Sequence, residues 1–150
     1  MINQQKHPIH LPHLQQLAEH LASPLPDLTQ MPWSEITILL LDDEGITLPN
    51  QEYFGKNRPT DVISFRYDPI PGETPALSGD LLINVQRALE AGSAHHGSNY
   101  ELALYIAHGI DHLSGSEDDT PEKRAAMLAT ETQWLKKAQT HHLLARIFHK

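Results

Sequence analysis

Two histidines one helical turn apart are the residues of this chain best suited to chemistry. His108 and His112 have the spacing that puts both rings on one face of a helix. Two imidazoles so placed can share one metal ion. Gly115 follows them, and glycine readily takes the left-handed conformation that ends a helix and reverses the chain. Carboxylates occupy positions 117–119, so the reversed chain can bring one of them to the same ion.

Two nitrogens and one carboxylate oxygen leave the fourth position of a tetrahedral zinc ion open to water, which is the form of a catalytic zinc site. The alternative is a chance pair on a helix surface, since the chain contains 11 histidines. The histidine spacing, the glycine and the acidic run occur together, however, and this combination is much more specific than a histidine pair. We therefore favour a metal site.

A largely buried helix is expected to position the two histidines, because the segment from Tyr100 to Leu113 is apolar on most sides. A last long helix is expected to begin at Thr120, a good N-cap residue, followed by Pro121 in the first turn. The expected core stripe of that helix consists of Leu128, Trp134, Leu135 and Ala138.

Strands are predicted at residues 34–41, 59–65 and 79–84, and a short edge strand is possible within residues 1–10. Helices are expected at residues 11–22 and from Asn84 to about His96, with a short helix or turn at residues 45–54. The acidic cluster at residues 42–44 is interpreted as a solvated turn, because nothing nearby completes a coordination shell.

The composition indicates a single globular domain that works in the cytoplasm. The chain has 150 residues, of which 39% are hydrophobic and 20% charged. It has no cysteine, so disulfides and thiolate metal sites are excluded. The longest aliphatic run, residues 38–41, is far too short to span a bilayer, and no signal peptide is apparent. The net charge of −8 argues against a large surface that follows nucleic-acid phosphates.

Two segments resemble the YbeY family, bacterial metal-dependent endoribonucleases that act in ribosomal RNA maturation. Residues 59–65 are similar to the family's Pro-Thr-Asp-Val-Leu-Ser-Phe, with Ile63 in place of leucine. Residues 108–118 resemble its His-Gly-x-x-His-Leu-x-Gly-x-x-His signature. The resemblance covers roughly residues 34–135, and the first 30 residues match poorly.

The resemblance implies an α+β fold, with one mixed sheet of about four strands, surrounding helices and a zincin-like metal site on a central helix. It implies that residues 1–150 form a single endoribonuclease domain with one Zn²⁺ per chain, held by His108, His112 and Asp118. The substrate would be single-stranded ribosomal RNA or the small ribosomal subunit, in rRNA maturation and ribosome quality control. A metal-bound water is the expected catalytic group, because the metal would lower its pKa. No general base can be named, and whether water or the ribose 2′-hydroxyl attacks stays open.

Lys56 and Arg58 form the densest basic spot before the C-terminal half of the chain. A solvated loop is the simpler account from the residues alone. Within the resemblance, these two side chains are the candidates for binding the phosphates that flank the cleaved bond.

The sequence departs from the family pattern at three positions. Asp118 stands where the third ligand is usually histidine, and an anionic ligand would make the metal a weaker Lewis acid. Phe54 follows Tyr53 where the family has an arginine implicated in activity, which puts catalytic power in doubt. Ser116 replaces an aromatic residue in the turn after the glycine.

Two other functions remain open from the sequence. A ribosome-assembly factor with a mainly structural metal would fit the net charge of −8 and the presence of Phe54. A metzincin-like metalloprotease would fit the spacing of the ligands, but those enzymes have a glutamate general base directly after the first histidine. Here that position is Gly109.

Overall fold

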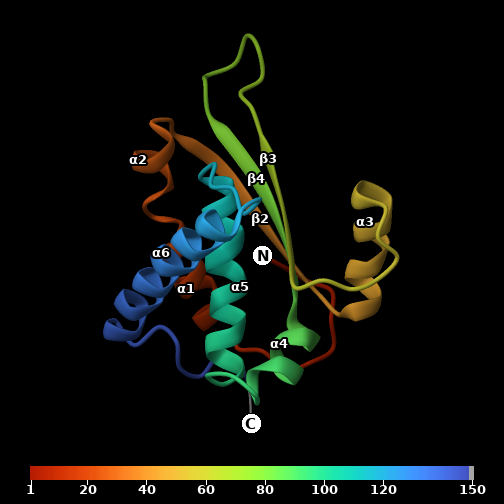
Figure 1. Cartoon of the computed structure of the whole chain (residues 1–150). Coiled ribbons are helices and arrows are strands. Elements are labelled where there is room, and N and C mark those ends of the chain that lie inside the picture. Colours follow the sequence, from red (N-terminus) through yellow and green to blue (C-terminus); the bar gives the residue numbers. More distant parts are fainter. Residues whose placement is uncertain (149–150) are drawn as a thin grey trace.

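The computed structural model describes residues 1–148 and shows an α+β fold built on one mixed four-stranded sheet, as expected (Figure 1). The strands are β1 (Ile2–Asn3), β2 (Trp33–Leu41), β3 (Val62–Tyr67) and β4 (Leu77–Asn84). The helices are α1 (Leu11–Ala22), α2 (Leu25–Thr29), α3 (Asp43–Phe54), α4 (Val85–Gly92), α5 (Ser98–Leu113) and α6 (Pro121–Thr140). Within residues 1–148, none of these helices is long and apolar enough to cross a membrane.

The strands lie in the order β1-β2-β4-β3. Strand β2 runs parallel to both β1 and β4, whereas β3 pairs with β4 in the antiparallel sense. The possible edge strand near the N-terminus is therefore confirmed as β1, which pairs with Leu39 and Leu40 of β2. Strand β3 forms the opposite edge of the sheet, and this edge lies beside α5 (Figure 1).

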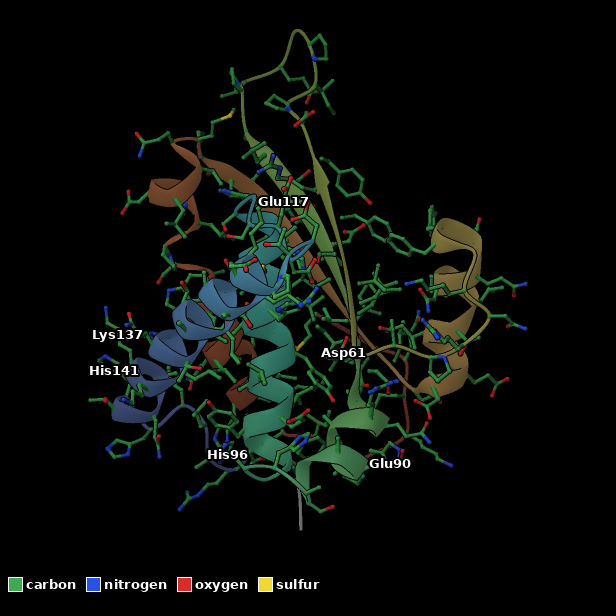
Figure 2. The ribbon with its side chains drawn as sticks, in the orientation of Figure 1. Asp61, Glu90, His96, Glu117, Lys137 and His141 are labelled. Carbon is green, nitrogen blue, oxygen red and sulfur yellow. The ribbon has the colours of Figure 1, made fainter. Side chains whose placement is uncertain are left out.

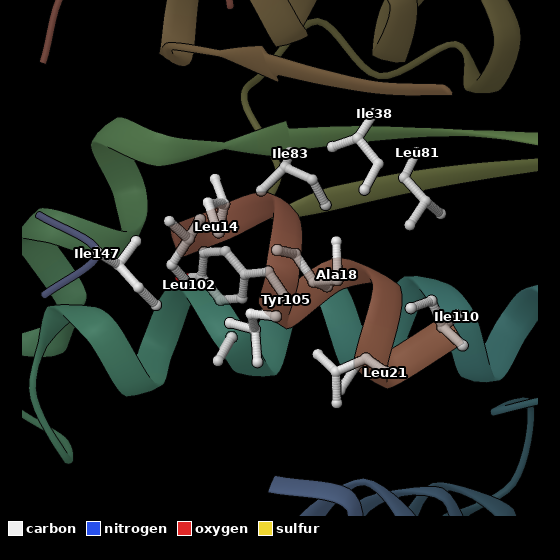
Figure 3. Packing of buried hydrophobic residues seen from close by; sticks show 14 of the residues in the cluster. Leu14, Ala18, Leu21, Ile38, Leu81, Ile83, Leu102, Tyr105, Ile110 and Ile147 are labelled. Atoms are coloured by element: carbon white, nitrogen blue, oxygen red, sulfur yellow. The ribbon is translucent and has the colours of Figure 1, made fainter. Parts of the chain in front are cut away.

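The main core lies between one face of the sheet and helices α1 and α5 (Figure 3). The fully buried side chains alternate along β4, where Leu81 and Ile83 face Ile106 and Leu102 of α5 within the same cluster. Helix α3 covers part of the other face over a smaller cluster (Figure 1). The sheet therefore holds α5, the helix of the two histidines, against its larger apolar face.

Gly109 marks a point where α5 approaches the sheet closely. A Cβ atom there would lie 2.8 Å from Leu81 Cδ2 and 3.2 Å from Val62 Cγ2. Because Leu81 is fully buried, it has little space into which to move. A side chain at position 109 would be directed into the sheet.

We expect Gly109→Ala to lower the free energy of unfolding by about 1–3 kcal/mol, the usual cost of overpacking a core. Equilibrium urea unfolding would measure the change, with Thr130→Ala on the exposed face of α6 as the control. A Gly109→Ala protein as stable as the parent would show that α5 can move away from the sheet at no cost.

Several local predictions were wrong in their details. Helix α4 ends at Gly92 rather than near His96, because the Gly92 carbonyl accepts hydrogen bonds from the backbone N–H groups of His95 and Gly97 as the chain turns into α5. The acidic cluster at residues 42–44 begins a helix rather than a solvated turn. There the Asp42 carboxylate accepts a hydrogen bond from the Gly45 N–H at 2.7 Å and caps α3.

The buried stripe of α6 was predicted only in part. Leu135 and Ala138 are buried as expected, and Trp134 packs partly buried against the main core. Leu128, however, is 53% exposed, and Met127 and Glu131 are buried. The helix is rotated so that Glu131 faces α5, where it finds a hydrogen-bonding partner. The pattern of apolar residues along the sequence could not predict that a carboxylate would occupy a buried position facing α5.

Candidate metal centre

The structure brings His108, His112 and Asp118 together at the C-terminal end of α5. The Nε2 atoms of the two histidines are 3.2 Å apart. Asp118 Oδ2 lies 3.5 Å from His112 Nε2 and 3.9 Å from His108 Nε2. A tetrahedral zinc ion about 2.0–2.2 Å from each ligand would space the ligand atoms roughly 3.4 Å apart. These three residues could hold a metal ion.

The turn at Gly115 carries Asp118 back toward the histidines, as the sequence predicted. Gly115 has a φ of +104°, which strongly favours glycine. The Ser116 N–H donates to the Asp111 carbonyl at 3.3 Å, which closes the turn at the end of α5. Ser116, which replaces the family's aromatic residue, thus contributes backbone groups to this turn.

The other ring nitrogens fix how the histidines carry their protons. His112 Nδ1 lies 3.2 Å from the Ser116 carbonyl oxygen, so Nδ1 must be the donor. His108 Nδ1 lies 3.1 Å from both carboxylate oxygens of Glu131. When Glu131 is ionised, its oxygens can only accept, so His108 Nδ1 is the donor and the Nε2 lone pairs of the two neutral rings face each other at 3.2 Å. A cation between them removes this repulsion, so the donor set fits a metal ion.

Glu131 is a residue beside the two histidines that sequence reasoning missed. Its side chain is only 2% exposed, and burial raises its pKa to about 7, with a further rise from the neighbouring Asp111 carboxyl. The hydrogen bond with Glu131 in turn raises the pKa of His108 above its usual value. The one signal in the sequence was the four-residue spacing of Met127, Glu131 and Leu135, which places the glutamate on the buried face.

A pocket of about 310 Å³ opens beside His108 and Asp118. It is also lined by Asp61, Tyr105 and Arg124, and Figure 2 shows Asp61 at the start of β3, across from α5. The Arg124 guanidinium donates to the Asp118 backbone carbonyl at 3.2 Å, which places a cation at the edge of the pocket. No pattern in the sequence had pointed to Arg124.

The remaining candidates lie elsewhere. Lys56 and Arg58 are exposed in the segment between α3 and β3, and neither is among the residues that line this pocket. Glu117 and Asp119 both pair with Lys123, at 3.2 and 3.1 Å, and Asp118 between them faces the histidines. Of the three consecutive carboxylates, the one predicted from the family spacing is therefore the one that faces the Nε2 atoms of the two rings.

Comparisons with known proteins agree on one family. The family model described as Endoribonuclease YbeY matches residues 1–139, so the similarity extends to the N-terminus and is not limited to residues 34–135. Endoribonuclease YbeY of an Exiguobacterium species is 37% identical over 123 residues, covering 75% of each chain. The protein of the same name from Syntrophomonas wolfei is 29% identical over 150 residues, covering 93% of this chain and 96% of the other.

A solved structure shows the same fold. The solution structure of a Thermotoga maritima protein superposes with a TM-score of 0.59 over 95% of this chain and 93% of the other, at 19% identity. The fold alone does not identify the family, but the family model and the relatives above 30% identity do. This chain belongs to the Endoribonuclease YbeY family.

Proposed function

We propose that this protein is a zinc-dependent endoribonuclease that cleaves single-stranded RNA in the maturation of ribosomal RNA, acting in the cytoplasm on the RNA or on the small ribosomal subunit. One observation supports the proposal above all. Two imidazole nitrogens face each other at 3.2 Å beside the Asp118 carboxylate, in a chain whose relatives are named endoribonucleases. Imidazole donors favour zinc over magnesium or calcium.

We further propose that residues 1–150 act as a single domain. The first and last described segments pack together, since Ile9 and Phe148 form a β-bridge and Ile147 belongs to the main core. The family match from residue 1 to residue 139 supports the same conclusion.

In this proposal His108, His112 and Asp118 hold the ion, and Glu131 keeps the proton of His108 on Nδ1. The zinc ion, when bound, would act as a Lewis acid on the scissile phosphate and lower the pKa of a water. Arg124 lies close enough to Asp118 to contact a phosphate in the pocket. Lys56 and Arg58 would bind phosphates farther along the RNA.

The two alternatives fit the site less well. A structural zinc site is normally closed by four protein ligands, whereas the group here offers three and adjoins an open pocket. A metzincin-like protease needs a glutamate at position 109, and that position faces Leu81 and Val62 of the sheet rather than the pocket.

Cleavage of a single-stranded RNA by zinc-loaded protein and by chelator-treated protein would test the proposed function. We expect cleavage with zinc, none after its removal, and recovery when zinc is added back. His108→Ala should not recover, which controls for a contaminating nuclease. A zinc-loaded protein that cleaves no single-stranded RNA would favour the assembly-factor function.

Zinc binding should weaken as the pH falls from about 7 to 5, because both histidine ligands must lose their protons to bind the ion. The pKa of His108 lies above its usual value of 6.5, owing to its hydrogen bond with Glu131, so proton competition should begin above pH 6.5. Atomic absorption after dialysis at each pH would measure the zinc content. Full loading retained at pH 5 would contradict a site with two histidine ligands.

A further inference from the structure

Two aromatic rings stand exposed at the C-terminal end of α3. Tyr53 is 61% exposed and Phe54 is 53% exposed. Both rings adjoin Phe65 of β3, with centroid distances of 5.0 Å for Tyr53 and 6.3 Å for Phe54, and the Phe54 and Phe65 planes differ by only 12°. We refer to Tyr53, Phe54 and Phe65 as the aromatic patch.

The exposure of Tyr53 and Phe54 indicates that the aromatic patch is not simply the edge of a hydrophobic core. Phe65 packs on the small cluster beneath α3 and is partly buried there. Tyr53 and Phe54 belong to neither buried cluster and keep more than half of their surface in solvent. A face of each exposed ring is therefore available to a ligand, and large exposed apolar side chains that lie together often mark binding sites.

One member of the aromatic patch, Phe65, lies on the edge strand β3, which begins next to the metal pocket. Strand β3 is the outer strand of the sheet and runs between α5 and α3 (Figure 1). Asp61, just before β3, lines the metal pocket, whereas Phe65 near the end of β3 faces the α3 side. A flexible polymer that crosses this edge can reach both places.

Unpaired positive charges follow the aromatic patch directly. Gly55 ends α3 with a φ of +69°, and the chain continues through Lys56 to Arg58. Both side chains are exposed, and within residues 1–148 neither forms an ion pair or hydrogen bond through its charged group. Two free cations beside stacked rings are notable in a chain with a net charge of −8.

We propose that the aromatic patch stacks unpaired RNA bases while Lys56 and Arg58 contact the adjoining phosphates, so that a single strand crosses the β3 edge on its way to the metal pocket. This inference rests on the proposed function. Aromatic stacking with a basic margin is the usual way in which proteins bind single strands without sequence preference. The bases of double-stranded RNA are already stacked and cannot use such a surface.

Fluorescence anisotropy with zinc-free protein and a labelled single-stranded RNA tests binding without cleavage. Loss of one stacking ring should weaken binding at least about fivefold, from the range measured by alanine substitution in other proteins. We therefore expect Phe54→Ala and Tyr53→Ala to bind at least about fivefold more weakly, and Phe54→Trp to bind like the parent. Leu48→Ala, which removes a 68% exposed aliphatic side chain from the same helix, is the matched control and should change nothing.

Two further measurements separate stacking from charge. An RNA of the same length that lacks several bases should bind the parent protein more weakly, and Phe54→Ala should then add little further loss. Lys56→Ala should instead reduce the salt dependence of binding, by about 0.7 in the slope of log affinity against log salt. Phe54→Ala should leave that slope unchanged.

The proposal is overturned if Phe54→Ala and Tyr53→Ala bind the single strand as the parent does, a result that would assign the aromatic patch to a protein partner. It is also overturned if these variants weaken double-stranded RNA equally, because stacking cannot explain such a loss. Either result leaves the proposed function intact, since zinc-dependent cleavage is measured separately. Failure of zinc-loaded protein to cleave any RNA would count against the function itself.

Discussion

Replacing Asp118 by alanine is expected to release the zinc ion and abolish RNA cleavage. The Asp118 carboxylate is the only anionic donor beside His108 and His112 in the group that could hold the ion, and its removal leaves two neutral ligands. Loss of a direct ligand should cost more than the 10–100-fold in affinity that is typical when an outer partner of a ligand is removed. Zinc stoichiometry and competition with a chelator would measure the effect.

The neighbouring carboxylates provide matched controls. Glu117 and Asp119 pair with Lys123 on the exposed surface, where such ion pairs contribute little to stability. Glu117→Ala and Asp119→Ala should therefore keep the metal. Asp118→His should also keep it, because imidazole is an equally suitable zinc ligand and restores the three-histidine set of the family.

The pattern of zinc loss among these variants would show which part of the proposed metal site is wrong. If Asp119→Ala lost zinc while Asp118→Ala retained it, the register of the turn after Gly115 would be wrong by one residue. If none of the variants lost zinc, the third ligand would lie elsewhere in the chain. The proposed metal site would then fail at its most specific position.

The parts of the candidate site that the sequence could predict are those set by local geometry. The four-residue spacing of His108 and His112 depends only on helix periodicity, and the reversal at Gly115 depends only on the freedom of glycine at positive φ. Both features are therefore expected however the other helices and strands are arranged around them. Three of the four strands could be predicted in the same way, because they are apolar runs bounded by turn residues, whereas the four-stranded mixed sheet was implied by the family resemblance.

The parts that could not be predicted depend on contacts between distant segments. Glu131 lies 23 residues from His108, and only the packing of α6 against α5 brings them together. The same packing turns Leu128 outward, against its expected place in the core. The grouping of Phe54 with Phe65 likewise requires α3 to fold over the sheet, and no local pattern encodes that contact.

Glu131→Gln is expected to weaken zinc binding about 10–100-fold, although Glu131 does not contact the ion in this proposal. The carboxylate accepts the Nδ1 proton of His108 and keeps the Nε2 lone pair directed at the metal. An amide can instead donate to Nδ1, which would favour the other tautomer and place a proton on Nε2. Chelator competition would measure the affinity, with the exposed Glu122→Gln on the same helix as the control.

The same substitution should change how stability depends on pH in the zinc-free protein. Burial raises the pKa of Glu131 from 4.5 to about 7, so the folded state binds more protons than the unfolded state between these values. The contribution of this carboxyl to stability is therefore complete below pH 4.5 and is lost as the pH rises through 7. The raised pKa of His108 acts in the same direction above pH 6.5.

Zinc-free protein should accordingly become less stable between pH 5 and pH 7.5, by at most roughly 3 kcal/mol from the Glu131 shift. Glu131→Gln should flatten this slope, because it removes the titrating group and the hydrogen bond that raises the pKa of His108. Urea unfolding at several pH values in the presence of a chelator would measure both slopes. Identical slopes in the two proteins would contradict this prediction. They would mean that burial does not raise the pKa of Glu131, and that its hydrogen bond does not raise the pKa of His108.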